Sequence, residues 1–229
     1  MENKKVRKWL EEHAEPKLRE FSSALVPGAR PMYGVRLPLL RAYARELAKR
    51  EDWRAWIEGA SDDTVEETLL QGLVIGYARM EADEAYTCLA AYAAKIDNWM
   101  LCDSPCCSFT FVRRDRERTW MFLQPYLASK EEFPLRFGVV MLLDHFLTDT
   151  YIDKVLECLD GLRPEGYYAR MGVAWALSVC FVKYPRQTMP FLEQSRLDDE
   201  TFNLAVRKIL ESRRTPEESR LLIRSLKRS

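Results

Sequence analysis

The apolar residues of this chain recur almost everywhere with the spacing of an α-helix, and this pattern constrains the fold more than any other feature. No stretch alternates cleanly between apolar and polar residues, as a half-buried strand would. Only nine glycines and eleven prolines occur in 229 residues, which argues further against a turn-rich all-β fold. The sequence therefore predicts an all-α protein.

About twelve helices are expected, because periodic segments of roughly 10 to 18 residues are separated by short breaks rich in Pro, Gly, Ser or Asp. The first segment is expected to bury Leu10, Leu18 and Phe21. A helix after the cluster Ser61-Asp62-Asp63 is expected to use that cluster as its N-cap. The other helices are expected over residues 38–49, 53–56, 82–94, 108–127 (in two pieces), 131–147, 151–159, 167–183, 186–194, 198–212 and 216–227.

Many helices joined by short breaks are typical of an array of two-helix repeats, in which each pair buries its apolar face on its neighbours. A compact irregular bundle is the structural alternative. No linker, low-complexity tract or change in composition divides the chain. We therefore expect a single repeat domain over residues 1–229.

Composition gives expectations about compartment and cofactors. The first residues are charged rather than apolar, and the longest apolar run, 171–182, is too short to span a bilayer. We expect a cytoplasmic protein with reduced cysteines and no membrane association. Cys102, Cys106 and Cys107 cluster without a CxxC pair, and the chain has only two histidines. We therefore expect neither a metal site nor a cofactor.

Trp99 and Asp103 are the first candidates for chemistry. They are four residues apart, so on a helix they lie one turn from each other on the same face. A flat aromatic ring beside a carboxylate can stabilise a positively charged group or transition state. The structural alternative is an interfacial tryptophan with a helix-capping aspartate.

Arg136 and Trp175 lie on otherwise apolar helical stripes. A guanidinium there is costly unless it forms a salt bridge or binds an anion such as a phosphate, and Trp175 taken alone would be a core residue. Arg136 follows Trp99 by 37 residues, and Trp175 follows Arg136 by 39. Both intervals approximate one HEAT-type repeat of about 40 residues, so the three positions could be equivalent in successive repeats.

Basic residues are unevenly distributed, although 35 acidic and 35 basic residues give a net charge of zero. Residues 207–229 contain eight Lys or Arg against three Glu, and residues 113–118 contain four Arg against two acidic residues. Such runs are usually solvated helical faces, but on a groove they could bind a phosphate backbone.

Four motifs together resemble the bacterial DNA alkylation repair glycosylases of the HEAT-like-repeat class, the AlkD family. These motifs are Gly34-Val35-Arg36-Leu37-Pro38-x-Leu40-Arg41, Asp97-Asn98-Trp99-x-x-Cys102-Asp103, Leu135-Arg136 and Gly172-x-x-Trp175-x-Leu177. The resemblance covers nearly the whole chain in order. The chain departs from the family at Ala176-Leu177-Ser178-Val179, where the family often places an Arg and a Glu.

The resemblance implies an α-solenoid, a right-handed superhelix of HEAT-like repeats with a concave DNA-binding face. It implies a monomer that binds double-stranded DNA carrying alkylated bases and hydrolyses the N-glycosidic bond of purines alkylated at N3 or N7. Asp103 would be the catalytic carboxylate, Trp99 and Trp175 would pack beside the damaged nucleotide, and Arg136 would hold the DNA backbone. The basic residues expected to bind DNA are Arg36, Arg113, Arg114, Arg207, Lys208, Arg213 and Arg214.

Two other functional classes stay open. The chain could be a HEAT-like protein that binds DNA without catalysis, or a scaffold for protein interactions, which is a frequent role of helical arrays. The joint presence of Trp99, Asp103, Arg136 and Trp175 favours the glycosylase over the scaffold.

Overall fold

The computed structural model describes residues 2–228, and these contain fourteen α-helices, one 3₁₀ helix and no strand. The prediction of an all-α protein is therefore confirmed. The chain divides into two compact units, residues 1–111 and 112–229. The single domain, the right-handed superhelix and its concave face stay predictions.

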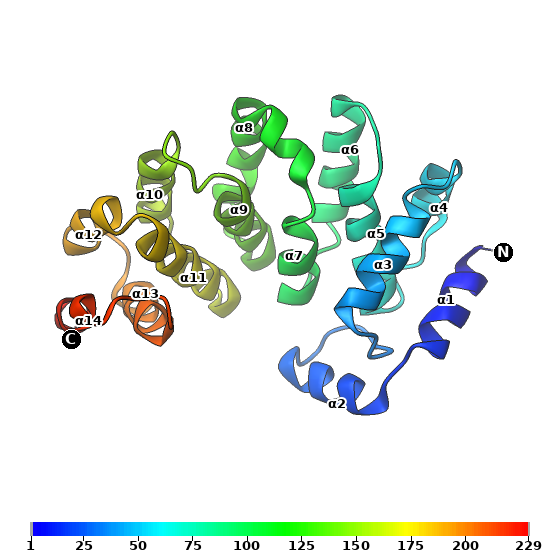
Figure 1. The fold of residues 1–229 in the computed structure, drawn as a ribbon, viewed down its shortest axis with the longest axis horizontal. Helices are drawn as coiled ribbons and strands as arrows, with labels where there is room; N and C mark the ends of the chain where they lie inside the picture. The colour runs from blue at the N-terminus through cyan, green and yellow to red at the C-terminus, as the bar shows by residue number, and fades with distance from the viewer. Residues whose placement is uncertain (1, 229) are drawn as a thin grey trace. The chain divides into compact units, whose positions relative to one another are not determined.

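The first unit is built around one central helix, α5. Its first eleven residues, from Val65 to Ile75, are all buried. Helices α3, α5 and α7 form one row of this unit, and α4 and α6 flank it (Figure 1). Its helices are α1 (Glu2–Glu12), α2 (Pro16–Leu25), α3 (Leu37–Leu47), α4 (Trp53–Gly59), α5 (Val65–Tyr77), α6 (Ala82–Ala93) and α7 (Trp99–Cys106).

The second unit is organised around α11 in the same way. Helix α11 packs between α9 and α13, while α8, α10 and α12 flank this row (Figure 1). The 3₁₀ helix Thr110–Arg114 precedes the unit's α-helices. These are α8 (Arg116–Leu127), α9 (Glu132–His145), α10 (Ile152–Gly161), α11 (Tyr167–Lys183), α12 (Pro185–Glu193), α13 (Asp199–Glu211) and α14 (Glu217–Ser225).

Two local expectations are wrong. Helix α2 has no buried residue, and Phe21 is 63% exposed instead of facing a core. Helix α5 begins at Val65, and its N-cap is Thr64, whose hydroxyl accepts a hydrogen bond from the Glu67 amide, rather than the cluster 61–63. Leu10, by contrast, is fully buried, as expected.

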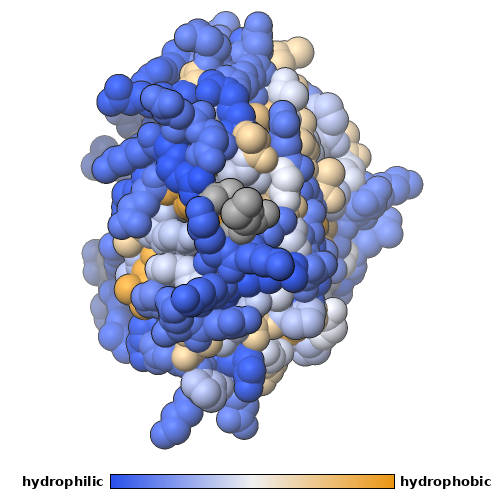
Figure 2. Space-filling model, turned by 90° about the vertical axis from the view of Figure 1, so that its right-hand side faces the viewer, coloured by the Kyte–Doolittle hydropathy of each residue, from blue (hydrophilic) through white to orange (hydrophobic). Residues whose placement is uncertain are grey.

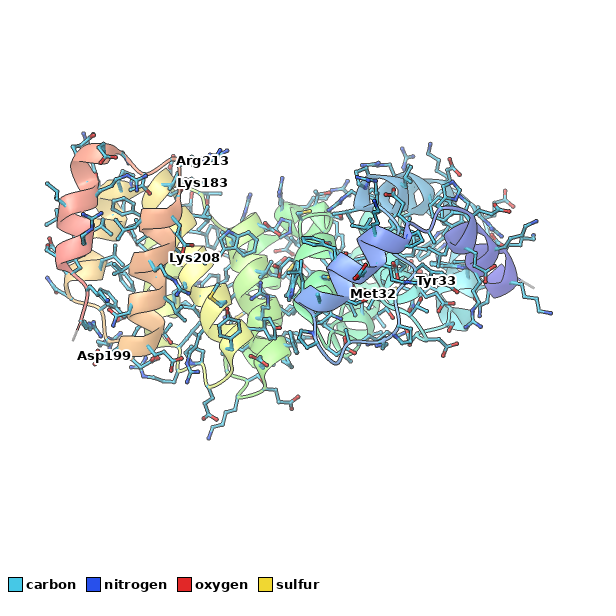
Figure 3. All side chains as sticks on the ribbon, turned by 90° about the horizontal axis from the view of Figure 1, so that it is seen from below. Met32, Tyr33, Lys183, Asp199, Lys208 and Arg213 are labelled. Carbon is cyan, nitrogen blue, oxygen red and sulfur yellow. The ribbon has the colours of Figure 1, made fainter. Side chains whose placement is uncertain are left out.

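The segment between α2 and α3 is held by a buried carboxylate of α5. Glu66 accepts hydrogen bonds from the backbone amides of Tyr33, Gly34 and Val35, at 3.1, 2.7 and 3.3 Å. Gly34 has a φ of +85°, and a Cβ there would lie 2.5 Å from the Arg19 amide nitrogen, so only glycine fits. Met32 and Tyr33, labelled in Figure 3, therefore lie in a turn that is fixed by hydrogen bonds.

The surface of the first unit around the N-terminus is mostly hydrophilic, with scattered apolar residues (Figure 2). Among residues 2–228, no helix combines the length and the apolar character needed to cross a membrane.

Candidate functional site

Helix α7 carries the first two candidate residues, and its start is fixed by a chain of polar contacts. The side-chain oxygen of Asn98 accepts hydrogen bonds from the amides of Met100 and Leu101, at 3.0 and 3.2 Å, and so forms an N-cap. Its side-chain nitrogen donates to Asp97 at 2.8 Å, and the other oxygen of Asp97 accepts from Arg30 at 2.9 Å. The first turn of α7 is therefore firmly placed.

Trp99 and Asp103 lie one turn apart on α7, as predicted, and both are half-buried. The indole nitrogen of Trp99 donates to the carbonyl of Leu25, the last residue of α2, at 3.3 Å. Leu101, Cys102 and Cys106 are fully buried. Helix α7 thus keeps one face in the core and places the tryptophan and the carboxylate where solvent reaches both.

Pro105 lies inside α7 and removes one helical hydrogen bond, because a proline nitrogen cannot donate to the carbonyl four residues earlier. That carbonyl belongs to Leu101, and the hydroxyl of Tyr92 donates to it at 2.7 Å. Burial raises the pKa of Tyr92 well above its usual value, so this hydroxyl keeps its proton. Gly72 of α5 makes room for the ring: a Cβ there would lie 2.4 Å from its Cζ atom.

Arg41 of α3 fixes the other end of α7. Its guanidinium donates to the carbonyl of Ser104 at 2.7 Å and to the hydroxyl of Ser108 at 3.0 Å. It also donates to the hydroxyl of Tyr77 at 2.9 Å. Arg41 thus joins the ends of α5 and α7 to α3, and a structural role explains its place in the first motif.

Arg136 and Trp175 belong to the second unit, on α9 and α11. Arg136 is only 6% exposed, and its Nη1 donates to the carbonyl of Tyr168 at 2.6 Å. Its side chain lies along Gly172, where a Cβ would be 3.4 Å from Cγ and 3.6 Å from Nη1. Trp175, half-buried, follows Gly172 by one turn on α11. Trp99 and Asp103 thus belong to the first unit, and Arg136 and Trp175 to the second.

Glu132 of α9 fixes the start of α11, the helix that carries Trp175. Its carboxylate accepts a hydrogen bond from the Tyr168 amide at 2.5 Å. A Cβ at Gly166 would lie 2.4 Å from the same carboxylate oxygen, so a larger residue there would displace the Glu132 side chain. The carbonyl of Tyr168 in turn accepts from Arg136. The backbone of one residue thereby connects the buried arginine to the first turn of α11.

Four of the basic residues expected to bind DNA contact other groups of the protein. Arg36 donates to both carboxylate oxygens of Glu15. Arg113 donates to the ring nitrogen Nδ1 of His145 at 3.1 Å. Arg207 and Lys208 both pair with Glu211, at 3.6 and 2.9 Å.

The other three expected DNA-binding residues are more available. Arg114, Arg213 and Arg214 are exposed, and within residues 2–228 their side chains have no acidic partner. Lys208 projects from α13, and Arg213 follows the C-terminal end of that helix (Figure 3). The binding roles of all seven basic residues stay predictions.

Metal ligation finds no support in the described part of the chain. Among residues 2–228, no group of three or more His, Cys, Asp or Glu side chains could hold a metal ion. All six cysteines are free thiols, of which Cys102, Cys106 and Cys180 are buried. The pKa of the Cys180 thiol is raised to about 12 by burial.

Sequence reasoning missed that Pro105 leaves a carbonyl of α7 in need of a donor and that Tyr92 supplies it. The proline was the available signal, because a proline inside a helix always leaves one carbonyl that needs another donor. That the donor is Tyr92 could not be read from the sequence, since the two residues belong to different helices.

Comparison with known protein families matches most of the chain. The family model described as "DNA alkylation repair enzyme" matches residues 6–212, which covers most of each unit and all four candidate residues and stops before α14. A search of curated proteins and a search of solved structures each returned no significant match.

Proposed function

The chain belongs to the family of DNA alkylation repair enzymes, and from this premise we propose that it is a DNA glycosylase. Its substrate would be a purine alkylated at N3 or N7 in double-stranded DNA, and its products the free base and an abasic site. The observation that carries the proposal is the pairing of Trp99 with Asp103 on the partly exposed face of α7, in a chain of this family.

The chemistry of the lesion explains why a single carboxylate suffices. Alkylation at N3 or N7 gives the purine a positive charge. When the bond between C1′ and the purine nitrogen breaks, the electron pair moves to the base and neutralises it. The leaving group therefore needs no proton from a general acid, and the second carboxylate of ordinary glycoside hydrolases is unnecessary.

Asp103 would act on the sugar. Positive charge develops at C1′ and the ring oxygen as the base leaves, and a carboxylate stabilises this charge. The attacking water forms the new bond to C1′, and its proton is lost to Asp103 or to solvent. Trp99 presents an aromatic face one turn away, and such a face favours cationic character in the bound nucleotide.

Arg136 and Trp175 would contact the DNA in this proposal. Gly172 lies against the Arg136 side chain and precedes Trp175 by one turn, so the arginine is held near the tryptophan. A guanidinium suits a phosphate of the backbone, and a half-exposed indole suits packing against a nucleotide. The link from Arg136 to the Tyr168 carbonyl fixes the orientation of the side chain.

The experiment is a base-release assay on a duplex with one 7-methylguanine, with free base detected by mass spectrometry. The same duplex without the methyl group is the control, and a duplex containing uracil tests the role of leaving-group charge. Release of 7-methylguanine but not of uracil supports the proposal, because only the methylated base leaves as a neutral molecule without protonation.

The alternatives give different results in the same assay. Salt-sensitive binding to the duplex without base release would identify a DNA-binding protein that lacks catalysis. The absence of both binding and release would point to a scaffold for protein interactions. Release of uracil at a similar rate would contradict the mechanism, since uracil leaves as an anion or with a proton from a general acid, and the mechanism supports neither.

A further inference from the structure

A pocket of about 560 Å³ in the first unit lies apart from Trp99 and Asp103, where α3 ends, α4 begins and α5 ends. Four of its lining residues are basic and two are aromatic. They are Arg45, Lys49, Arg50, Arg79, Trp53 and Tyr77. None of these basic residues was expected to bind DNA from the sequence.

The pocket has an excess of positive charge. No acidic residue lines it, and Arg50 is paired with Asp52, with both carboxylate oxygens accepting at 2.8 and 2.7 Å. Across residues 2–228, the side chains of Arg45, Lys49 and Arg79 have no acidic partner. Three cations of one pocket thus repel one another, and an anion bound among them would relieve this repulsion.

The aromatic residues give the pocket a firm wall. The guanidinium of Arg45 lies 4.7 Å from the centre of the Tyr77 ring, a cation–π contact. The hydroxyl of that ring accepts from Arg41, and Trp53 is only 4% exposed, so neither ring is loosely held. A guanidinium held against a ring in this way can still donate N–H groups to a phosphate, because its donors lie in its own plane.

Helix dipoles offer a simpler explanation for some of these cations. A basic residue near a helix C-terminus stabilises that helix, and Arg45 lies in the last turn of α3. This effect acts at each helix end separately, however. It does not explain why one pocket is lined by basic residues from three places, namely α3, the α3–α4 turn and the segment after α5.

We propose that this pocket binds a phosphate group, and that the phosphate is one of the DNA backbone outside the damaged nucleotide. The inference rests on the proposed function for the identity of the ligand. The pocket would contribute to affinity independently of sequence and lesion, because phosphate contacts position a protein on DNA without reading its bases. A free phosphate is the other source of the same chemistry.

The test compares two double variants with the wild-type chain in binding to an undamaged duplex over a range of salt concentrations. Lys49→Gln with Arg79→Gln removes two charges of the pocket. Lys4→Gln with Lys8→Gln removes two charges from α1, also in the first unit, and is the matched control. Lys49 and Arg79 are exposed, and an unchanged melting temperature shows that the pocket variant still folds.

The pocket variant is expected to weaken DNA binding about tenfold at 0.1 M salt and to reduce the slope of log K against log salt by about one to two. The control variant should change neither value comparably. Equal effects of the two variants on DNA, with no binding of inorganic phosphate to the wild type in calorimetry, would overturn the proposal. The variants could also affect DNA binding equally while inorganic phosphate binds the wild type and the control but not the pocket variant. That result would support the pocket as a phosphate site and assign it to a free phosphate.

The design separates this inference from the proposed function. Binding to an undamaged duplex needs no catalysis, and base release is measured in single turnover at saturating protein. Normal release, with no specific effect of the pocket variant on DNA binding and no binding of inorganic phosphate, would defeat the pocket alone. A reduced salt slope in a chain that releases no base would defeat the glycosylase alone.

Discussion

Replacing Gly72 with alanine should destabilise the protein, because it disturbs the contact that supports α7, the helix that carries Trp99 and Asp103. The new Cβ would lie 2.4 Å from Cζ of Tyr92, so the fully buried ring would have to move. The hydroxyl of Tyr92 donates to the Leu101 carbonyl that Pro105 leaves without its helical partner. A displaced ring would therefore leave a buried carbonyl of α7 unsatisfied.

The expected magnitude combines three opposing effects. Alanine in place of glycine stabilises a helix by about 1 kcal/mol. Overpacking a core costs about 1 to 3 kcal/mol, and a buried polar group left without its partner costs about 1 to 3 kcal/mol. The net destabilisation is then roughly 1 to 5 kcal/mol, which lowers the melting temperature by about 2 to 4 °C for each kcal/mol.

Gly172→Ala is the matched control, since it is the same substitution in the middle of another helix. A Cβ at Gly172 would be 3.4 Å from the nearest atom, Cγ of Arg136, which is an ordinary contact. It should therefore raise stability by about 0.5 to 1 kcal/mol. Scanning calorimetry of both variants checks the opposite signs. Equal stabilisation by the two alanines would refute the reasoning, because it would mean that the Tyr92 ring moves without cost.

Three further perturbations follow from single contacts. Glu66→Ala should destabilise the protein by roughly 2 to 6 kcal/mol in urea unfolding, because it leaves buried backbone amides of the 33–35 turn without an acceptor. Burial raises the pKa of Asp160, but hydrogen bonds from Arg196 and its neighbour Ser195 outweigh burial and lower the pKa below 3.8. The stabilisation from Asp160 should thus be complete above about pH 5 and be lost progressively as the pH falls further. Asp160→Ala should abolish this loss in acid titrations. Iodoacetamide at pH 8 should label the exposed Cys107 first and spare Cys180, whose pKa is raised to about 12 by burial, as peptide mass mapping would show.

The helices could largely be predicted from the sequence because their apolar stripes and breaks are local signals. The expected helix 167–183 coincides with Tyr167–Lys183, and the expected pair within 108–127 corresponds to a 3₁₀ helix and α8. Phe21 shows where this reasoning stops. Periodicity indicates that Leu18 and Phe21 share one face of α2, but it does not show whether another element covers that face.

The candidate residues were predictable to the extent that they depend on spacing within one helix. Trp99 and Asp103 share a face of α7 because they are four residues apart. The contacts that support them join different helices: Tyr92 with Leu101, and Arg136 with Tyr168. The basic pocket was missed for the same reason, since Arg79 is far from Arg45 and Lys49 in the chain.

The single-turnover rate of 7-methylguanine release by Asp103→Asn tests the central claim most directly. Asparagine keeps the shape of the side chain and removes its negative charge, and the exposed Asp153→Asn on α10 is the control. Asp103→Asn should lower the rate about 10²- to 10³-fold, the usual effect of losing one electrostatic contact to a transition state. Its DNA affinity should persist, and Asp153→Asn should release the base at the wild-type rate. A rate for Asp103→Asn equal to that of the control would contradict the assignment of the catalytic carboxylate.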